Sequence, residues 1–263
     1  MALTKAELSY LLALQQKKGR QQHRRFLAEG VRLLEEALEA NYRPQVVFYA
    51  PSEVGERGQK LIAEFIARGV ETKSISVKEC SRLADTESSQ GMVAVIDQRQ
   101  YDLAKQLESG PRRVLVCDKI GDPGNLGTLI RSATAFSFDL VITTEATAEV
   151  TNPKTVRATM GALFRMPIIA AVDDKTVIGR LKRFGYDVYA ADVKGKYISR
   201  TLPISAKAAL VIGSEAAGSG PTLVSMADYR IKIPMAPKTE SLNAAVAGSI
   251  LMFWFAAAER MHQ

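Results

Sequence analysis

The chain has 263 residues, 47% of them hydrophobic and 24% charged, a composition that favours a folded α/β protein of two modules and excludes a disordered or low-complexity chain. Its formal net charge of +7 points to an anionic partner without locating where that partner binds. Two cysteines and two histidines are too few for a disulfide framework or a metal cluster, so we expect no bound metal.

The ends of the chain predict neither an export signal nor a membrane anchor. Lys5 and Glu7 interrupt the apolar stretch near the N-terminus, which spoils the core of a signal peptide. Near the other end, the apolar run 250–258 is too short to span a bilayer. We therefore expect a cytoplasmic protein with no membrane segment.

Helical and strand patterns alternate over residues 1–97 and predict a small α/β domain. A basic cluster lies near its start and comprises Lys17, Lys18, Arg20, Arg24 and Arg25. Such a cluster is typical of a surface that contacts RNA phosphates, although a solvated helix face has the same composition. The other predicted elements are a helix over 31–38, a strand over 45–50, a helix over 58–68 and a strand over 91–96.

Residues 98–111 are polar and end in Ser-Gly-Pro, which predicts a linker. From residue 112 to residue 263, short apolar strands alternate with helices. This pattern predicts a doubly wound, Rossmann-like parallel sheet with its ligand at the carboxyl ends of the strands. The predicted strands are 114–117, 140–142, 186–190 and 210–212.

Three punctuated segments of this second module predict a common pocket. Residues 122–136 and 211–221 each follow an apolar, strand-like run and carry polar side chains among glycines. Residues 239–243 lead directly into an apolar helix. Ser241 and Asn243 are suited to cap that helix, and its first N–H groups can also hold polar atoms of a ligand.

The glycines at the start of the first segment and just before it do not fit a dinucleotide-binding enzyme. Gly121, Gly124 and Gly127 have the spacing GxxGxxG rather than GxGxxG. No acidic residue follows about 20 positions later at the end of a second strand. A nucleotide-dependent oxidoreductase is therefore a disfavoured alternative.

In this order, the three segments resemble the three motifs of the SpoU (TrmH) branch of the SPOUT-class RNA ribose 2′-O-methyltransferases. The first motif reads NLGTLIRSA at 125–133, the second GSE at 213–215, and the third IPM at 233–235 followed by SLN at 241–243. Upstream, EGVRLLEEAL and ESSQGMVAVI resemble the opening and closing segments of the small substrate-binding domain of many such enzymes. The resemblance therefore covers nearly the whole chain.

The resemblance implies both a fold and an activity. Residues 1–97 would form an L30e-like domain that holds RNA, and residues 112–263 a SPOUT methyltransferase domain with a trefoil knot. The implied reaction transfers a methyl group from S-adenosyl-L-methionine to a ribose 2′-hydroxyl of RNA. The expected substrate is ribosomal RNA of the 23S type. The alternatives are a transfer RNA 2′-O-methyltransferase and a noncatalytic RNA-binding or ribosome-assembly factor on the same scaffold.

The matched motifs also imply site residues. The implied catalytic residues are Asn125, Arg131, Glu215, Ser241 and Asn243, and the implied cofactor-binding residues are Ala191, Gly213, Ile233 and Leu242. A guanidinium is a poor base, so we expect Arg131 to hydrogen-bond the 2′-hydroxyl and to stabilise the developing alkoxide. An ion pair, a helix cap or a core contact would explain the same side chains structurally.

Two further surfaces follow from the resemblance. The segment 152–167, with Lys154, Arg157 and Arg165, resembles a region that faces RNA. A homodimer through the C-terminal domain is also implied. The helix predicted over 244–258 agrees with this expectation, because it is more apolar around its circumference than one core-facing side requires.

Overall fold

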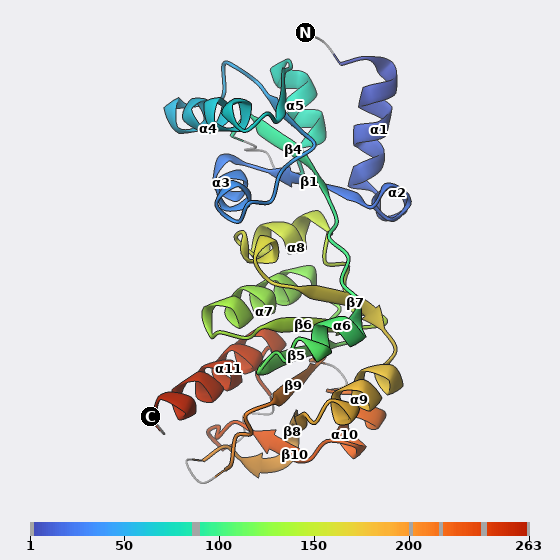
Figure 1. Ribbon diagram of the computed structural model, residues 1–263, viewed down its shortest axis with the longest axis vertical. Helices are drawn as coiled ribbons and strands as arrows, with labels where there is room; N and C mark the ends of the chain where they lie inside the picture. Colours follow the sequence, from blue (N-terminus) through green and yellow to red (C-terminus); the bar gives the residue numbers. More distant parts are fainter. Residues whose placement is uncertain (1–2, 86–89, 200–201, 216–217, 238–240, 262–263) are drawn as a thin grey trace. The chain divides into compact units, whose positions relative to one another are not determined.

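The computed structural model describes residues 3–85, 90–199, 202–215, 218–237 and 241–261. The chain divides into two compact units (Figure 1): unit 1 is Met1–Arg99 with Thr151–Arg165, and unit 2 is Gln100–Val150 with Met166–Gln263. Thr239 and Glu240 of the third motif segment lie outside the described residues, as do residues 87–89 of the segment ESSQGMVAVI. Thr151–Arg165 follows the start of unit 2 in the sequence and yet folds with unit 1.

Unit 1 is a four-stranded sheet with helices packed on it. Its strands are β1 (Arg25–Glu29), β2 (Val46–Tyr49), β3 (Glu71–Ser74) and β4 (Met92–Asp97). Its helices are α1 (Lys5–Gln15), α2 (Lys17–His23), α3 (Val31–Glu39), α4 (Glu56–Ala67), α5 (Val77–Leu83), α8 (Pro153–Ala158) and the 3-10 helix η1 (Ala162–Phe164). The helices predicted at 31–38 and 58–68 are confirmed as α3 and α4.

The strands of unit 1 lie in the order β1-β4-β2-β3. β4 runs antiparallel to β1 and β2, whereas β2 and β3 are parallel. The strands predicted at 45–50 and 91–96 are confirmed as the central strands β2 and β4, whose burial explains their apolar sequences. The edge strands β1 and β3 are not evident in the sequence, since β1 begins in the basic cluster and β3 reads ETKS.

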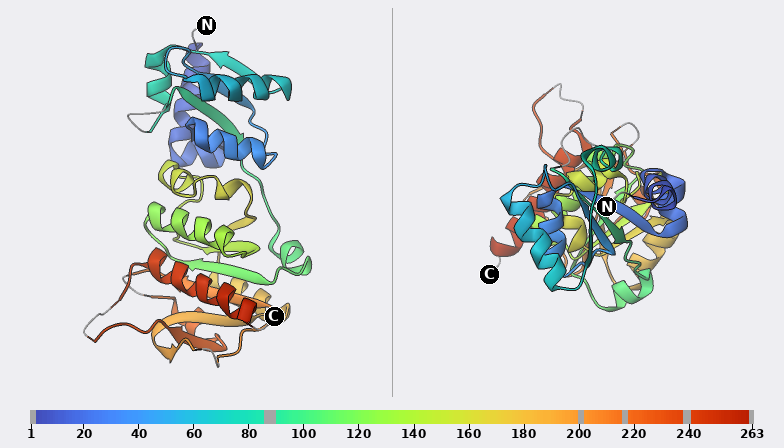
Figure 2. Two further views of the ribbon diagram at one scale, coloured as in Figure 1. Left: turned by 90° about the vertical axis from the view of Figure 1, so that its left-hand side faces the viewer. Right: turned by 90° about the horizontal axis from the view of Figure 1, so that it is seen from above.

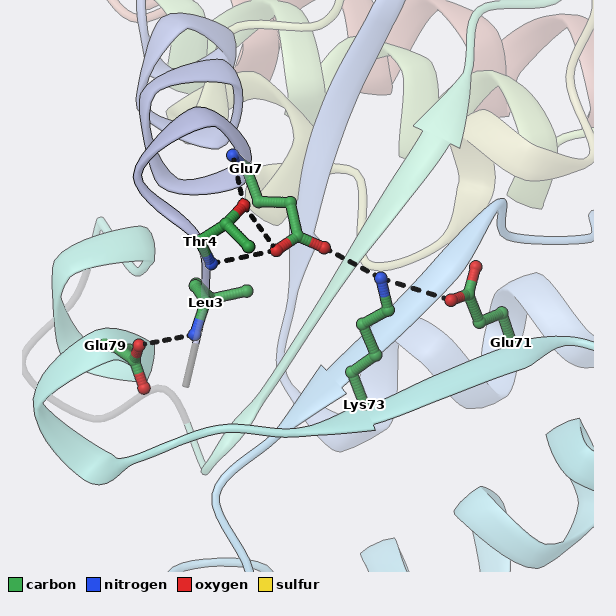
Figure 3. Close-up of polar contacts among 6 residues, drawn as sticks. All are labelled: Leu3, Thr4, Glu7, Glu71, Lys73 and Glu79. Atoms are coloured by element: carbon green, nitrogen blue, oxygen red, sulfur yellow. Dashed lines mark hydrogen bonds and ion pairs between the residues drawn. The ribbon is translucent and has the colours of Figure 1, made fainter. Parts of the chain in front are cut away.

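A polar network ties the first helix of unit 1 to its sheet (Figure 3). Thr4 and Glu7 form a capping box, in which the Thr4 hydroxyl accepts the Glu7 N–H and the Glu7 carboxylate accepts the Thr4 N–H at 2.9 Å. The other Glu7 oxygen accepts a 2.8 Å hydrogen bond from Lys73 of β3. This bond is the largest cause that lowers the pKa of Glu7 from 4.5 to about 2.

Unit 2 is built on a six-stranded sheet. Its strands are β5 (Arg113–Asp118), β6 (Leu140–Thr144), β7 (Ile168–Val172), β8 (Asp187–Tyr197), β9 (Ala208–Gly213) and β10 (Tyr229–Lys232). Its helices are α6 (Leu103–Glu108), α7 (Pro123–Ala135), α9 (Asp174–Arg183), α10 (Pro221–Ser225) and α11 (Ala244–Met261). The strand order is β10-β8-β9-β5-β6-β7, and every neighbouring pair is parallel.

This topology confirms the predicted parallel sheet, and the four predicted strands correspond to β5, β6, β8 and β9. Buried parallel strands read as continuous apolar runs, which is why these strands are evident in the sequence. β7 and β10 lie at the two edges of the sheet, are more exposed, and carry no such signal. The trefoil knot that the resemblance implies stays a prediction.

Part of the polar segment 98–111 is helical. Asp102 caps α6 by accepting the Lys105 N–H at 2.9 Å, and Leu107 is fully buried in the core of unit 2. The helix has a single buried residue among polar neighbours, so its sequence resembles that of a linker. The ordered chain of unit 2 therefore begins ahead of β5.

The motif segments begin two helices that pack together, α7 and α11 (Figure 2). Asp122 caps α7 by accepting the Asn125 N–H at 2.9 Å, and Pro123 occupies its first turn. Gly248 of α11 lies against Leu129 of α7, where a Cβ atom would come within 2.3 Å of the leucine side chain. No helix of the described residues is long and apolar enough to cross a membrane.

Candidate active site

A cavity of about 650 Å³ lies in unit 2, within the size range of small-molecule pockets. It is lined by residues 191–194, which follow the part of β8 that pairs with β9, by residues at or beyond the carboxyl ends of β9 and β10, and by the start of α11. This is where parallel α/β sheets bind their ligands. All four residues implied to bind a cofactor line this unit 2 cavity: Ala191, Gly213, Ile233 and Leu242.

Gly213 leaves room for the loop that follows β9. A Cβ atom at this position would lie 2.1 Å from the backbone of Gly218 and Ser219. The loop doubles back here, since the Gly218 N–H donates to the Ser214 carbonyl at 2.8 Å. Only glycine allows this approach, and the described residues of the loop line the cavity: Gly213, Ser214, Glu215, Gly218 and Ser219.

Residues from all three motifs meet through hydrogen bonds beside the cavity. One carboxylate oxygen of Glu215, Oε1, accepts from Nδ2 of Asn125. The side-chain Nδ2 of Asn243 donates to Oδ1 of Asn125 at 3.1 Å and lies 3.4 Å from the same Glu215 oxygen. These hydrogen bonds connect α7, the loop after β9 and the start of α11 at one point. That point lies at the cavity, because Glu215 lines it.

Asn243 also caps α11. Its Oδ1 accepts the N–H groups of Ala245 at 3.0 Å and Val246 at 3.2 Å, while Glu215 accepts the Ala244 N–H at 3.3 Å. A helix N-terminus favours a carboxylate through its dipole. The capping explanation of Asn243 is therefore correct, and it holds together with its place in the cluster, because its amide nitrogen remains available to Asn125 and Glu215.

The remaining two implied catalytic residues differ in position. Ser241 lines the unit 2 cavity and is exposed. Arg131 does not join the cluster: it lies on the exposed side of α7, about 9 Å along the helix axis from Asn125 and about 120° around it. Among the described residues its guanidinium has no hydrogen bond or ion pair, so it is available to an external group.

The cavity contains charged residues that the sequence reasoning missed. Asp192, Lys194, Arg230 and Lys232 all line it. Asp192 lies two residues after the predicted strand 186–190, so its place near the carboxyl end of that predicted strand is a signal that could have identified it. The cationic members of this set come from the edge strand β10 and from the irregular part of β8, which have no comparable pattern.

A further missed residue is Asp118, at the carboxyl end of β5. It is fully buried and accepts 2.6 Å hydrogen bonds from the Thr144 hydroxyl and the Gly220 N–H. Gly220 closes the loop that begins at Gly213, so Asp118 holds the far end of that loop. Its position one residue after the predicted strand 114–117 is again the signal.

The basic cluster of unit 1 is only partly available to RNA. Arg20 is buried and donates to the backbone carbonyls of Leu14 and Gln15. Arg25 hydrogen-bonds Tyr10 and Asp97, and these bonds raise its pKa. Three other members are exposed: Lys17, Lys18 and Arg24.

The arginines of the segment 152–167 are likewise engaged within unit 1. Arg157 pairs with Asp85 at 2.7 Å, and Arg165 pairs with Glu36 and, at 2.9 Å, with Glu39. The resemblance implies that this segment faces RNA, but these ion pairs already neutralise the charges of its two arginines. Within the described part of the chain, no group of three or more His, Cys, Asp or Glu side chains could hold a metal ion.

Comparison with known proteins identifies the class to which this site belongs. Residues 112–253 match the model of the SpoU rRNA Methylase family, and residues 5–94 match that of the MRM3-like substrate binding domain. The first match spans more than half of the chain and contains all three motifs. The chain belongs to the SpoU rRNA methylase family.

Individual relatives agree over nearly the full length. The chain is 32% identical to the 23S rRNA (guanosine(2553)-2′-O)-methyltransferase RlmP of Bacillus subtilis, with 91% of this chain and 92% of that protein covered. It is 29% identical to human mitochondrial rRNA methyltransferase 3, covering 89% and 68% of the two chains. An AdoMet-bound rRNA methyltransferase from Sinorhizobium meliloti has the same fold, with a TM-score of 0.85, 30% identity and coverage of 100% and 97%.

Proposed function

We propose that this chain is an S-adenosyl-L-methionine-dependent enzyme that methylates a ribose 2′-hydroxyl of ribosomal RNA. The observation that carries the proposal is the hydrogen-bonded cluster of Asn125, Glu215 and Asn243 at the wall of the unit 2 cavity. A noncatalytic RNA-binding protein has no need to join three separate loops at one point beside a cavity. Ribosomal RNA is favoured over transfer RNA by the similarity to RlmP and to the mitochondrial enzyme.

The residues present fit the proposed cofactor. Ile233 and Leu242 offer apolar walls for an adenine ring, and the backbone of Gly213, which lines the cavity, offers N–H and C=O groups to its edge. When bound, the cofactor supplies a methyl group on a positively charged sulfur. Ala191, at the end of the regular part of β8, completes the proposed set of contacts.

The chain's own residues have separate proposed roles. Glu215 fixes the amides of Asn125 and Asn243, and with Ser241 these groups position the ribose at the cavity mouth. Arg131 donates hydrogen bonds to the 2′ oxygen and stabilises the negative charge that develops there. Its lack of a partner among the described residues supports this role.

The direct test is methyl transfer by the purified full chain. Tritiated S-adenosyl-L-methionine and deproteinised large-subunit ribosomal RNA should give label in RNA that resists base hydrolysis at one position, because a 2′-O-methyl group blocks cleavage of the adjacent bond. Total transfer RNA serves as the comparison substrate. Tight binding of ribosomal RNA without any transferred label would support the noncatalytic alternative instead.

We further propose a homodimer formed through the outer face of α11. Val246, Ile250 and Phe253 are 48%, 37% and 58% exposed and follow one another at helical spacing on one face. Phe253 contacts Phe136, which follows α7, with ring centroids 5.8 Å apart, so the apolar surface extends onto a second element. A second copy of the same face is an occupant of matching chemistry.

The proposed division of labour follows the resemblance. Residues 1–97 bind RNA and residues 112–263 carry the methyltransferase. Residues 98–111 connect the two domains, and within them α6 packs with the methyltransferase unit. The match of residues 5–94 to a substrate-binding domain supports the first assignment. A cytoplasmic location is part of the proposal and is supported by the likeness to a bacterial 23S rRNA methyltransferase.

A further inference from the structure

β8 departs from regular pairing at the unit 2 cavity. Ala190 pairs with Arg230, but the next residue of β10, Ile231, pairs with Lys196. Residues 191–195 therefore bulge out of the strand, and residues 191–194 line the cavity. Bulges commonly redirect side chains beside functional sites. The side chains of this bulge and of the residues that follow it are therefore candidates for contacts with a ligand of the cavity.

Two contacts hold the bulge against β10. Gly195 approaches the neighbouring strand so closely that a Cβ atom would lie 2.6 Å from the backbone of Arg230. Asp192 forms a 2.6 Å ion pair with Arg230 and accepts the Lys194 N–H at 2.8 Å. Burial opposes ionisation of Asp192, but these bonds outweigh it and lower its pKa. The bulge is thus a defined structure with a charged, paired acid.

Tyr197 follows the bulge as the last residue of β8 and is 58% exposed. It pairs with Lys232 of β10, whose ammonium nitrogen lies 4.2 Å from the centroid of the tyrosine ring. This cation–π contact fixes one side of the ring. A flat aromatic surface is therefore presented to solvent in a defined orientation, next to a lysine that also lines the cavity.

The surroundings of Tyr197 are positively charged. Lys194 and Lys232 line the unit 2 cavity, and Lys196 is exposed on the adjoining strand position. The acid of the bulge, Asp192, is already paired with Arg230. The combination of an exposed ring and lysines that have no ion pair among the described residues complements a chain that has both flat bases and phosphates.

We infer that Tyr197 is a stacking platform for an unpaired base of the RNA, with Lys194 and Lys232 contacting the phosphates on either side. This inference rests on the proposed function and names the RNA conformation that the site accepts, a single-stranded stretch. Bases of a regular duplex are stacked on each other and cannot lie flat on a side chain. The platform therefore selects substrates whose target lies in a loop or an unpaired segment.

The test compares Tyr197→Phe, Tyr197→Leu and wild type in the full chain. Phenylalanine keeps the flat ring, whereas leucine keeps apolar bulk without it. We expect the KM for ribosomal RNA to rise about tenfold in Tyr197→Leu and to change less than about twofold in Tyr197→Phe, within the range measured for loss of one stacked base. The Kd for S-adenosyl-L-methionine, measured by calorimetry, should stay unchanged in both. Met226→Ala, which removes another exposed apolar side chain, is the matched control.

A second measurement uses the unmodified protein. Ribosomal RNA containing 4-thiouridine, crosslinked by light and digested, should label the peptide that contains Tyr197. If Tyr197→Leu has the wild-type KM, or if crosslinks form elsewhere and never on this peptide, the platform is wrong even though methyl transfer stands. If Tyr197→Leu binds RNA normally but loses binding to a protein partner, the surface is a protein-docking site and the platform is wrong. Absence of methyl transfer by wild type would instead overturn the proposed function, while the crosslink still tests the RNA contact.

Discussion

The fold engages the arginines of the unit 1 basic surfaces differently from Arg131 of unit 2. In unit 1, Arg20, Arg25 and Arg165 are committed to backbone carbonyls, a tyrosine or acidic side chains. In unit 2, the guanidinium of Arg131, the proposed catalytic arginine, has no such partner among the described residues. The contrast shows that the number of basic residues in a segment is a poor measure of its capacity to bind RNA. What matters is how many of the charges the fold leaves uncompensated.

Loss of Arg131 should have the largest effect. Arg131→Ala should lower the turnover of methyl transfer by at least about a hundredfold, the usual cost of removing a donor that stabilises developing charge. The Kd for S-adenosyl-L-methionine should hardly change, since the guanidinium acts in the transition state on the acceptor. Arg131→Lys should not restore turnover, because the lysine ammonium lacks the planar pair of N–H donors that a guanidinium presents. Near-normal turnover of the alanine variant would make Arg131 a structural residue.

The second largest effect is expected at the apolar face of α11. The two units differ here too, because the proposed contact with a second copy lies in unit 2. Phe253→Glu should convert a dimer into a monomer at micromolar concentration, because it places two like charges in the apolar interface. Multi-angle light scattering gives the mass directly. Ile66→Glu, at an exposed apolar position of α4 in unit 1, should leave the mass unchanged. A monomeric wild type would remove the dimer proposal.

The comparison of arginines can be sharpened within the basic cluster. Changing both Lys17 and Lys18 to Gln should weaken RNA binding about tenfold and make the slope of log K against log salt shallower by about 1 to 2, because two exposed charges are lost. Arg20→Gln should lower the melting temperature and leave that slope as it is. An equal change of slope in both variants would show that burial does not decide the contribution to RNA binding.

The smallest expected effect concerns Glu7, whose side chain is half-buried beside Lys73. Its folded pKa of about 2 lies below the ordinary 4.5, so the carboxylate stabilises unit 1 above pH 4.5, and this contribution is lost as the pH falls toward 2. The melting temperature of Glu7→Gln should therefore lie below that of wild type at pH 7, and the two should converge in acid. Glu64→Gln, on the exposed side of α4, is the control, for which no such converging difference is expected.

The sequence predicted those parts that depend on local pattern or on motif. Central strands such as β2 and β5 were evident because buried runs are apolar, and the site residues came from motif resemblance rather than from spacing. The bulge of β8 could not be predicted, because it depends on the register between β8 and β10. The burial of Arg20 and the pairing of Arg165 with Glu39 depend on tertiary contacts that no local pattern encodes.

The membership of Thr151–Arg165 in unit 1 has a consequence for synthesis of the protein. The ribosome releases residues in order, so β1 to β4 emerge long before α8 and η1, which complete their unit. β5 and β6 emerge in between and must wait for β7 to β10. Unit 1 can therefore be completed only after the first part of unit 2 has been synthesised, and an exchange of unit 1 between relatives needs three junctions in the gene rather than one.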